Sequence, residues 1–172
     1  MPDGALTSQP VGHFDFCVAN PDECGPNRGE RKPVHLSRKL WARIVDVNNA
    51  VNVMVAPKTD WELWGREEVW SYPDREGDCE DYALEKRRQL MAAGVPASTL
   101  LMTVVRQRNG DGHAVLTVRT DMGDFVLDNL EPRVLAWNET EYRFLKRQSS
   151  KNAGEWVSVQ GRPASIVGSV RN

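Results

Sequence analysis

Apolar residues recur at intervals of three and four positions along one long segment near the N-terminal third of the chain. The recurring positions are Leu36, Leu40, Ile44, Val47, Val51, Met54 and Val55. This spacing is typical of a helix with an apolar stripe along one side. Ser37 precedes the pattern and is a residue type that caps helix N-termini. We therefore predict a helix over residues 36–55 whose stripe faces the core.

A second helix is predicted from the residues that bound it. Residues 80–93 contain neither Gly nor Pro, Gly77 breaks regular structure before them, and Gly94-Val95-Pro96 is a helix stop. Cys79 then falls in the first turn, where free backbone N–H groups and the helix dipole favour the nucleophilic thiolate. A cysteine at an arbitrary position is more often a small buried side chain. Position alone therefore leaves both interpretations open.

Three segments rich in β-branched residues and separated by turn residues predict an antiparallel meander. A fourth segment, residues 156–160, alternates apolar and polar positions and predicts an edge strand. With the two helices, these strands indicate an α+β fold in which helices pack on an antiparallel β-sheet. The meander strands are expected at residues 100–106, 113–119 and 125–129, with turns at 108–112 and 120–124.

The remaining segments are expected to be irregular. Residues 1–33 are rich in Pro, Gly and polar groups and predict a surface loop, and residues 56–73 predict a loop with a short helical turn. The second loop carries Trp61, Trp64 and Trp70, most of which are expected to form a small core beneath it. The alternative is that Trp64 or Trp70 walls a substrate cleft. We divide the chain into an N-terminal surface segment (1–35), one domain (36–161) and a tail (162–172) compatible with disorder.

Composition narrows the class of protein. A chain of 172 residues with 40% hydrophobic residues is the size of one globular domain. No apolar run approaches the ~18 residues of a membrane span. The formal net charge is −2, from 22 basic and 24 acidic residues, which gives no overall attraction to nucleic acid or to a membrane. A soluble domain with ordinary surface charge is expected.

The three cysteines divide into a close pair and a single residue. Cys17 and Cys24 flank Asn20-Pro21, a turn that can bring their sulfur atoms together, so we predict a disulfide between them. This leaves Cys79 as a free thiol. Two unpaired thiols remain the alternative, and a metal site is disfavoured because the spacing is not C-x-x-C and no second pair exists.

A disulfide requires an oxidising compartment such as a periplasm. The N-terminal Met1-Pro2-Asp3-Gly4 is polar and lacks the apolar run of a signal peptide. We expect a periplasmic protein whose signal peptide was removed before residue 1, and a cytosolic protein is the alternative.

A nucleophile, a base and an orienting carboxylate can be assembled from these elements. In a hairpin of residues 113–119 and 125–129, His113 and Asp128 share one end of the sheet and meet diagonally. Packing the second helix on this sheet would bring Cys79 beside them. Cys79 would then attack a carbonyl carbon, His113 would transfer the proton and Asp128 would hold the imidazole. Each residue alone has an ordinary structural explanation.

The order and spacing of these residues resemble the bacterial transglutaminase-like cysteine peptidases, whose best-known branch is the LapG-type periplasmic adhesin proteases. The resemblance covers roughly residues 36–135. It is carried by Glu62-Leu63-Trp64-Gly65, Trp70, Gly77-Asp78-Cys79-Glu80-Asp81-Tyr82-Ala83, Lys86, Leu90, Gly94, His113-Ala114-Val115-Leu116 and Val126-Leu127-Asp128-Asn129. It implies a papain/transglutaminase-like fold, hydrolysis of a peptide bond, and a catalytic triad of Cys79, His113 and Asp128.

The resemblance also implies partners. LapG-type enzymes cleave a surface adhesin near its N-terminus, and an inner-membrane cyclic-di-GMP receptor sequesters them. The chain departs from that pattern at Ala114, where LapG-type proteins commonly have Met, and in the segment of Cys17 and Cys24, which is more similar to an alphaproteobacterial side branch. A protein substrate is therefore expected, and an adhesin and a cyclic-di-GMP receptor are expected only as far as the LapG-type resemblance extends.

Three carboxylates surround the predicted nucleophile: Asp78, Glu80 and Asp81. Acidic residues in a first turn are stabilised by the helix dipole, by about 0.3–1 kcal/mol each. They also disfavour a thiolate and raise the pKa of a neighbouring cysteine, so a positive charge should offset them. Calcium suits hard oxygen ligands on a flexible turn. Calcium dependence is also what the resemblance implies, with these acidic residues as ligands.

Two other functions are compatible with the same residues. The thioester formed on Cys79 would also serve a transglutaminase or an amidase, because only the acceptor of the acyl group differs. In a third interpretation the acidic turn is a calcium-regulated binding surface, and the protein is not an enzyme.

Overall fold

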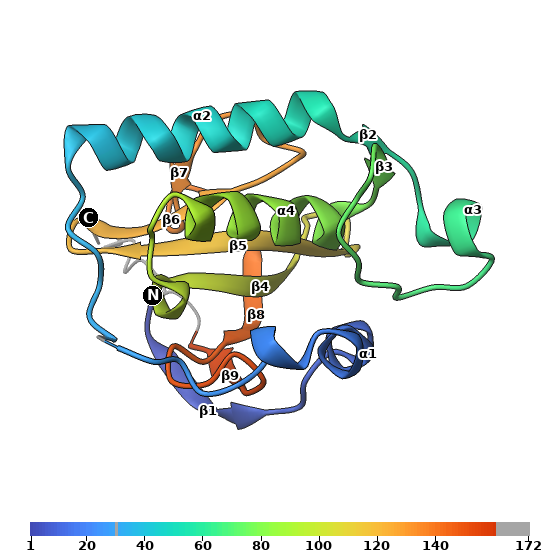
Figure 1. The fold of residues 1–172 in the computed structure, drawn as a ribbon, viewed down its shortest axis with the longest axis horizontal. Coiled ribbons are helices and arrows are strands. Elements are labelled where there is room, and N and C mark those ends of the chain that lie inside the picture. The colour runs from blue at the N-terminus through green and yellow to red at the C-terminus, as the bar shows by residue number, and fades with distance from the viewer. Residues whose placement is uncertain (30, 161–172) are drawn as a thin grey trace, which may run out of the picture.

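The structure is a computed structural model that describes residues 1–29 and 31–160, and its centre is a seven-stranded sheet (Figure 1). All neighbouring strands of this sheet are antiparallel. Across the sheet they are β1 (Asp3–Thr7), β9 (Trp156–Val159), β8 (Arg143–Gln148), β4 (Leu100–Arg106), β5 (Gly112–Thr120), β6 (Gly123–Leu127) and β7 (Leu135–Ala136). The predicted α+β class, with helices on an antiparallel sheet, is confirmed.

Strands β4, β5 and β6 form the predicted meander. Val105 pairs with His113 across β4 and β5, and Leu116 pairs with Leu127 across β5 and β6. Gly110 lies in the first turn and Gly123 begins β6 directly after the second, and their φ angles of 98° and 119° lie in the region that favours glycine. Local turn chemistry therefore determines the register that places His113 at one end of β5.

The first predicted helix is α2 (Arg38–Met54). Its N-terminus is capped by Ser37, whose Oγ accepts a hydrogen bond from the Leu40 N–H at 3.1 Å. Ile44, Val47 and Val51 are buried, as their spacing predicts.

The second predicted helix is α4 (Cys79–Ala92), which packs on β4 and β5 and also contacts α2 (Figure 1). Leu84 and Leu90 are buried in the main core, between the helices and the sheet. The helix ends before Gly94, which has a φ of 88°. Because α4 lies between α2 and the sheet, its N-terminus is held in a fixed position beside β5.

The opposite face of the sheet carries a smaller apolar cluster. Its buried members come from β4, β5, β6, β8 and β9, and Met1, Trp137 and Tyr142 pack against them. These buried members are Val105, Val115, Val126, Phe144 and Val159. Because both faces are covered, the central strands carry apolar residues at consecutive positions.

The prediction of a surface loop over residues 1–33 is wrong. Strand β1 pairs with β9, helix α1 (Val11–Ala19) buries His13 and Phe16, and a short 3-10 helix follows at Pro21–Glu23. Neither element has a strong local pattern, because β1 is almost entirely exposed and α1 contains a glycine and follows a proline. Pairing with the C-terminal strand decides the structure of this segment.

The C-terminal strands also differ from the prediction. Strand β9 lies between β1 and β8 rather than at an edge, and β8 was not expected. The sequence of β8 lacks a clear strand pattern because it contains several charged residues. One of them, Arg147, is buried and pairs with Asp124 (3.1 Å) and Asp3 (2.8 Å). A buried arginine with two carboxylate partners looks like a surface residue when only the sequence is read.

The segment between α2 and α4 contains a parallel pair, β2 (Ala56–Pro57) with β3 (Glu76–Gly77), and the short helix α3 (Asp60–Trp64). Trp61 and Trp64 lie on α3 with 63% and 56% of their surface exposed, so the expected burial is wrong for both. Trp70 is buried. A further 3-10 helix spans Ala97–Thr99.

The predicted tail, residues 162–172, lies outside the described part of the chain. Among the described residues, no helix is long and apolar enough to cross a membrane.

Candidate active site

The position of Cys79 is determined by a sharp turn into α4. Gly77 ends β3, Asp78 occupies the N-cap position, and Cys79 is the first residue of the helix. A Cβ atom at Gly77 would lie 2.7 Å from the Oδ2 atom of Asp81. The turn can therefore close against the first helical turn only with glycine at position 77.

His113 and Asp128 are in contact at one end of the β5–β6 hairpin. The His113 Nε2 and Asp128 Oδ1 atoms are 2.8 Å apart, and both side chains are buried. The register that pairs Leu116 with Leu127 offsets the two residues along the strands, so the contact is diagonal. With Nε2 committed to the carboxylate, Nδ1 is the nitrogen left for a reacting thiol.

Two further groups hold the Asp128 carboxylate. The Leu130 backbone N–H donates to Oδ1 at 2.9 Å, and the Tyr142 hydroxyl donates to Oδ2. Burial by itself would raise the pKa of Asp128, but the hydrogen bond and charge of His113, together with these donors, hold it below its ordinary value. Asp128 therefore stays ionised next to the imidazole.

Cys79 and His113 line the same cleft, whose other walls include Trp70, Pro10 and Val11, the first residue of α1. The Cys79 Sγ atom accepts a hydrogen bond from the Ala114 N–H at 3.3 Å and donates one to Glu80 Oε2 at 3.0 Å. The structure thus places the predicted nucleophile, base and orienting carboxylate at one site. Their separate positions on a helix start, a strand start and a strand end make this a tertiary arrangement.

The electrostatic surroundings of Cys79 oppose ionisation. Burial raises the pKa of the thiol well above its ordinary value, and the charge of Glu80, with the hydrogen bond to it, raises it further. The charge of Asp78 acts in the same direction, while the Ala114 N–H partly offsets it. The conflict expected from the flanking acids is therefore present, and the helix dipole does not resolve it.

A cluster of three carboxylates lies beside the thiol and includes a residue that the sequence analysis missed. Oxygen atoms of Asp60, Asp78 and Glu80 all lie within 4.8 Å of one another. Asp60 Oδ1 and Asp78 Oδ1 are buried and have no hydrogen-bond partner. Burial and the neighbouring charge of Glu80 raise the pKa of Asp78 to about 8. A set of converging carboxylate oxygens with unused acceptor capacity has the donor chemistry of a calcium site.

The sequence of residues 3–164 matches the family model of the bacterial transglutaminase-like cysteine proteinases (BTLCP). The chain belongs to this family. The match includes β1 and α1, which confirms that the N-terminal elements are part of the family fold. No curated protein sequence matches the chain significantly.

Solved structures of Legionella pneumophila LapG are similar to this BTLCP proteinase. One has 26% sequence identity and a TM-score of 0.58, covering 69% of this chain and 67% of LapG. The calcium-bound form has 22% identity and a TM-score of 0.61, covering 92% and 86%. An EGTA-treated form has 24% identity and a TM-score of 0.53, covering 70% and 68%. The last two likenesses show the transglutaminase-like protease fold.

The remaining predicted site residues of this BTLCP member lie in different surroundings. Trp70 lines the cleft with Cys79, whereas Trp64 is exposed on α3. Asp81 Oδ1 accepts a hydrogen bond from the Ser71 N–H at 2.8 Å. Burial raises the pKa of Asp81 to about 7. Its carboxylate thus holds the residue that follows Trp70, whereas Asp60 joins the group with Asp78 and Glu80.

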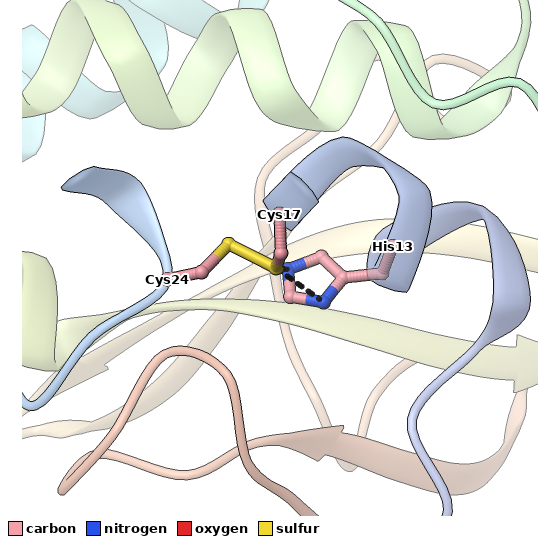
Figure 2. Close-up of side chains that lie close together, drawn as sticks. All are labelled: His13, Cys17 and Cys24. Atoms are coloured by element: carbon pink, nitrogen blue, oxygen red, sulfur yellow. Dashed lines mark hydrogen bonds between the residues drawn. A yellow bond between two sulfur atoms is a disulfide. The ribbon is translucent and has the colours of Figure 1, made fainter. Parts of the chain in front are cut away.

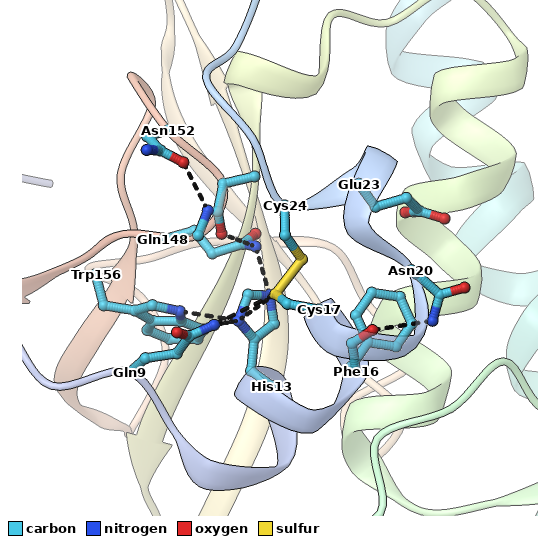
Figure 3. The surroundings of a disulfide bond; sticks show 12 residues. Gln9, His13, Phe16, Cys17, Asn20, Glu23, Cys24, Gln148, Asn152 and Trp156 are labelled. Carbon is cyan, nitrogen blue, oxygen red and sulfur yellow. Dashed lines mark hydrogen bonds between the residues drawn. A yellow bond between two sulfur atoms is a disulfide. The ribbon is translucent and has the colours of Figure 1, made fainter.

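Cys17 and Cys24 form the expected disulfide, which joins the last turn of α1 to the end of the following 3-10 helix (Figure 2). His13 lies beside it, with Nδ1 3.6 Å from Cys17 Sγ. Figure 3 shows that the ring also faces Trp156 and Gln148 on the C-terminal strands, at 3.2 and 2.9 Å. The disulfide and this histidine attach α1 to the sheet.

Asp60, Tyr142 and the first turn of α1 are the site residues that sequence reasoning missed. Asp60 follows Thr59 in a capping box, so the local pattern indicates only a helix start. Tyr142 precedes β8, the strand concealed by its charges. The sequence contains no spacing signal for any of the three, because each reaches the site from a distant segment.

Proposed function

We propose that this proteinase is a cysteine endopeptidase in which Cys79 is the nucleophile, His113 the general base and acid, and Asp128 the orienting carboxylate. The observation that carries the proposal is the shared cleft: Cys79 and His113 both line it, and Asp128 holds the His113 ring from the side opposite Nδ1. Membership of a cysteine proteinase family agrees with this assignment of roles.

The proposed reaction follows from the positions of the groups. His113 Nδ1 accepts the Cys79 proton as the sulfur attacks the peptide carbonyl carbon, and the developing imidazolium is stabilised by Asp128. The tetrahedral intermediate collapses to a thioester, the C–N bond breaks and the leaving amine takes the proton from His113. Water activated by His113 then hydrolyses the thioester and restores the thiol.

The backbone N–H of Cys79 is the candidate donor to the oxyanion. It lies in the first turn of α4, where backbone N–H groups have no acceptor within the helix. A donor fixed by a buried helix stabilises the developing negative charge without reorganising during the reaction.

Calcium is the proposed cation of the acidic cluster. Asp60, Asp78 and Glu80 would hold it, since their oxygen atoms converge and two of them have no partner. Asp81 lies outside this proposed ligand set because it is not in the group of carboxylates whose oxygen atoms converge within 4.8 Å. The bound ion would supply positive charge that offsets the carboxylates next to Cys79. A calcium-bound form of LapG, a protein of the same fold, supports this choice of ion.

The proposed substrate is an exported or cell-surface protein, and the proposed location is the periplasm. The Cys17–Cys24 disulfide supports an oxidising compartment. An adhesin-type substrate and a cyclic-di-GMP receptor as a partner remain predictions based on the LapG-type resemblance.

The test is cleavage of a library of proteome-derived peptides, with products identified by mass spectrometry. Wild type with calcium is expected to produce new peptide termini, and Cys79→Ala and His113→Ala are expected to produce none. His35→Ala is the matched control, because His35 is exposed and pairs with Asp121 at 2.6 Å on the surface. Equal cleavage by wild type and Cys79→Ala would overturn the mechanism. Isopeptide crosslinks without hydrolysed peptides would instead identify an acyl transferase.

A further inference from the structure

Helix α1 carries an apolar stripe on its exposed side. Val11, Phe14 and Val18 recur at intervals of three and four residues, so they lie on one side of the helix. Their exposed fractions are 71%, 57% and 69%. The opposite side of α1 is buried through His13 and Phe16. The helix is therefore packed on one side and presents Val11, Phe14 and Val18 on the other, with the exposed Asp15 beside them.

The N-terminal end of this stripe reaches the cleft of the proposed nucleophile. Val11 and Pro10 line that cleft together with Cys79 and His113. Gly12 allows α1 to pack closely against Trp70. A Cβ atom at this position would lie 2.4 Å from Trp70 Cδ1 and 2.5 Å from the Glu68 carbonyl oxygen. Glycine at this position lets the α1 backbone contact Trp70 directly, so the first residue of the stripe lies in the wall of the cleft.

The C-terminal end of the stripe is also fixed. The Cys17–Cys24 disulfide lies in the last turn of α1, one residue before Val18. A rigid element binds with a smaller loss of conformational entropy than a mobile loop does. Both ends of α1 are thus anchored while its apolar side stays open.

We propose that Val11, Phe14 and Val18 form a substrate-binding rail that selects apolar side chains in the peptide segment next to the scissile bond. The inference rests on the proposed peptidase function and adds the class of substrate residues that the site accepts. The substrate peptide is the occupant because the rail is continuous with the cleft: Val11, the first residue of the rail, lines the same cleft as Cys79 and His113.

The length of the rail sets how many substrate residues it contacts. From Val11 to Val18 the helix rises about 10 Å, at 1.5 Å per residue. An extended peptide covers this length with about three residues, and its side chains alternate between two sides. The rail therefore selects two apolar residues, at alternate positions on one side of the scissile bond.

The experiment compares cleavage-site profiles on the proteome-derived peptide library used above. Wild type is expected to show enrichment of apolar residues at two alternate positions on one side of the cleaved bond. Phe14→Glu is expected to lose this enrichment and to cleave apolar-flanked peptides about tenfold more slowly, because a charged side chain in the rail rejects an apolar one. Phe14→Leu is expected to retain the preference.

The control for an added charge is Val53→Glu. Val53 is 87% exposed on α2 and does not line the cleft, so this variant is expected to keep the wild-type profile. The rate at which iodoacetamide modifies Cys79 is measured for each variant. An unchanged rate for Phe14→Glu shows that the substitution affects peptide binding and not the reactivity of the thiol.

The outcomes separate the two proposals. Absence of cleavage by wild type contradicts the peptidase function. Cleavage by wild type and Phe14→Glu with the same profile overturns the rail alone. A change of oligomeric state in Phe14→Glu, measured by light scattering, with an unchanged profile assigns the stripe to contacts between copies of the chain and also overturns the rail.

Discussion

His13 shows how one buried side chain depends on its surroundings for its charge. His13 has 1% of its surface exposed, and burial, followed by the charge of Arg87, lowers its pKa from 6.5 to about 4. An imidazolium would carry N–H groups on both nitrogens, facing the N–H donors of Trp156 and Gln148. The folded protein therefore keeps His13 neutral down to about pH 4, whereas in the unfolded chain the ring is protonated below about pH 6.5.

Acidification is expected to remove part of the stability through His13. Between about pH 6.5 and pH 4, His13 binds a proton in the unfolded chain but not in the folded protein. The free energy of unfolding therefore falls as the pH is lowered through this range. The expected contribution is a loss of about 2 kcal/mol between pH 7 and pH 5. Urea unfolding at several pH values measures it.

The control separates the effect of His13 from that of Asp60, Asp78 and Glu80, whose raised pKa values change the stability with pH in the opposite direction. The difference in pH slope between wild type and His13→Gln reports the contribution of the histidine. An NMR titration in which the His13 ring protonates near pH 6.5 would contradict the assignment.

At the scale of elements, α3 and the start of α4 together carry the acidic cluster. Asp60 is the first residue of α3, and Asp78 and Glu80 flank Cys79 at the start of α4. The parallel pair β2–β3 brings the two helix starts together. A cation shared by both helices would thus link the loop to the nucleophile.

Calcium is expected to stabilise the folded protein through Asp60. At a concentration a hundredfold above its Kd, a ligand of the folded state contributes about 2.7 kcal/mol. For a domain of this size that raises the Tm by about 5 to 10 °C. Differential scanning fluorimetry with calcium or EGTA measures the shift.

Asp60→Asn is expected to abolish the calcium-dependent shift, because it removes a charged ligand. Asp74→Asn is the matched control, since Asp74 is an exposed aspartate in the loop before β3. A wild-type shift in Asp60→Asn would remove Asp60 from the ligand set. Magnesium is the control ion and is expected to shift the Tm less, because it requires a stricter octahedral geometry.

At the scale of the whole molecule, the N- and C-terminal segments complete the site together. Strand β1 pairs with β9, and His13 of α1 contacts Trp156 and Gln148 on β9 and β8. These contacts join residues more than 130 positions apart. The cleft wall formed by α1 therefore depends on the closure of the entire sheet.

Removal of the disulfide is expected to weaken this closure. The bridge spans seven positions of sequence, and a loop of that size contributes about 2 to 3 kcal/mol in the chain-entropy model. The double variant Cys17→Ser/Cys24→Ser should show this loss in urea unfolding. Dithiothreitol should lower the midpoint of wild type but leave the double variant unchanged. Equal midpoints for wild type and the double variant would contradict a stabilising role.

The local signals in the sequence determined much of the architecture and of the site. The three-and-four spacing predicted α2, the break at Gly77 predicted the start of α4, and the turn glycines predicted the meander with His113 and Asp128 at one end. These features depend on neighbouring residues along the chain, so the sequence alone was sufficient. The same holds for the pairing of Cys17 with Cys24 across a short turn.

Only the tertiary structure decided which distant residues complete the site. Asp60 joins Asp78 through the pairing of β2 with β3, Arg147 is buried in β8 between two aspartates, and α1 reaches the cleft because Gly12 packs on Trp70. Each residue looks like a surface or loop residue in its local sequence. Each is stabilised by partners far along the chain. A pattern over ten or twenty neighbouring residues therefore gives no information about these partners.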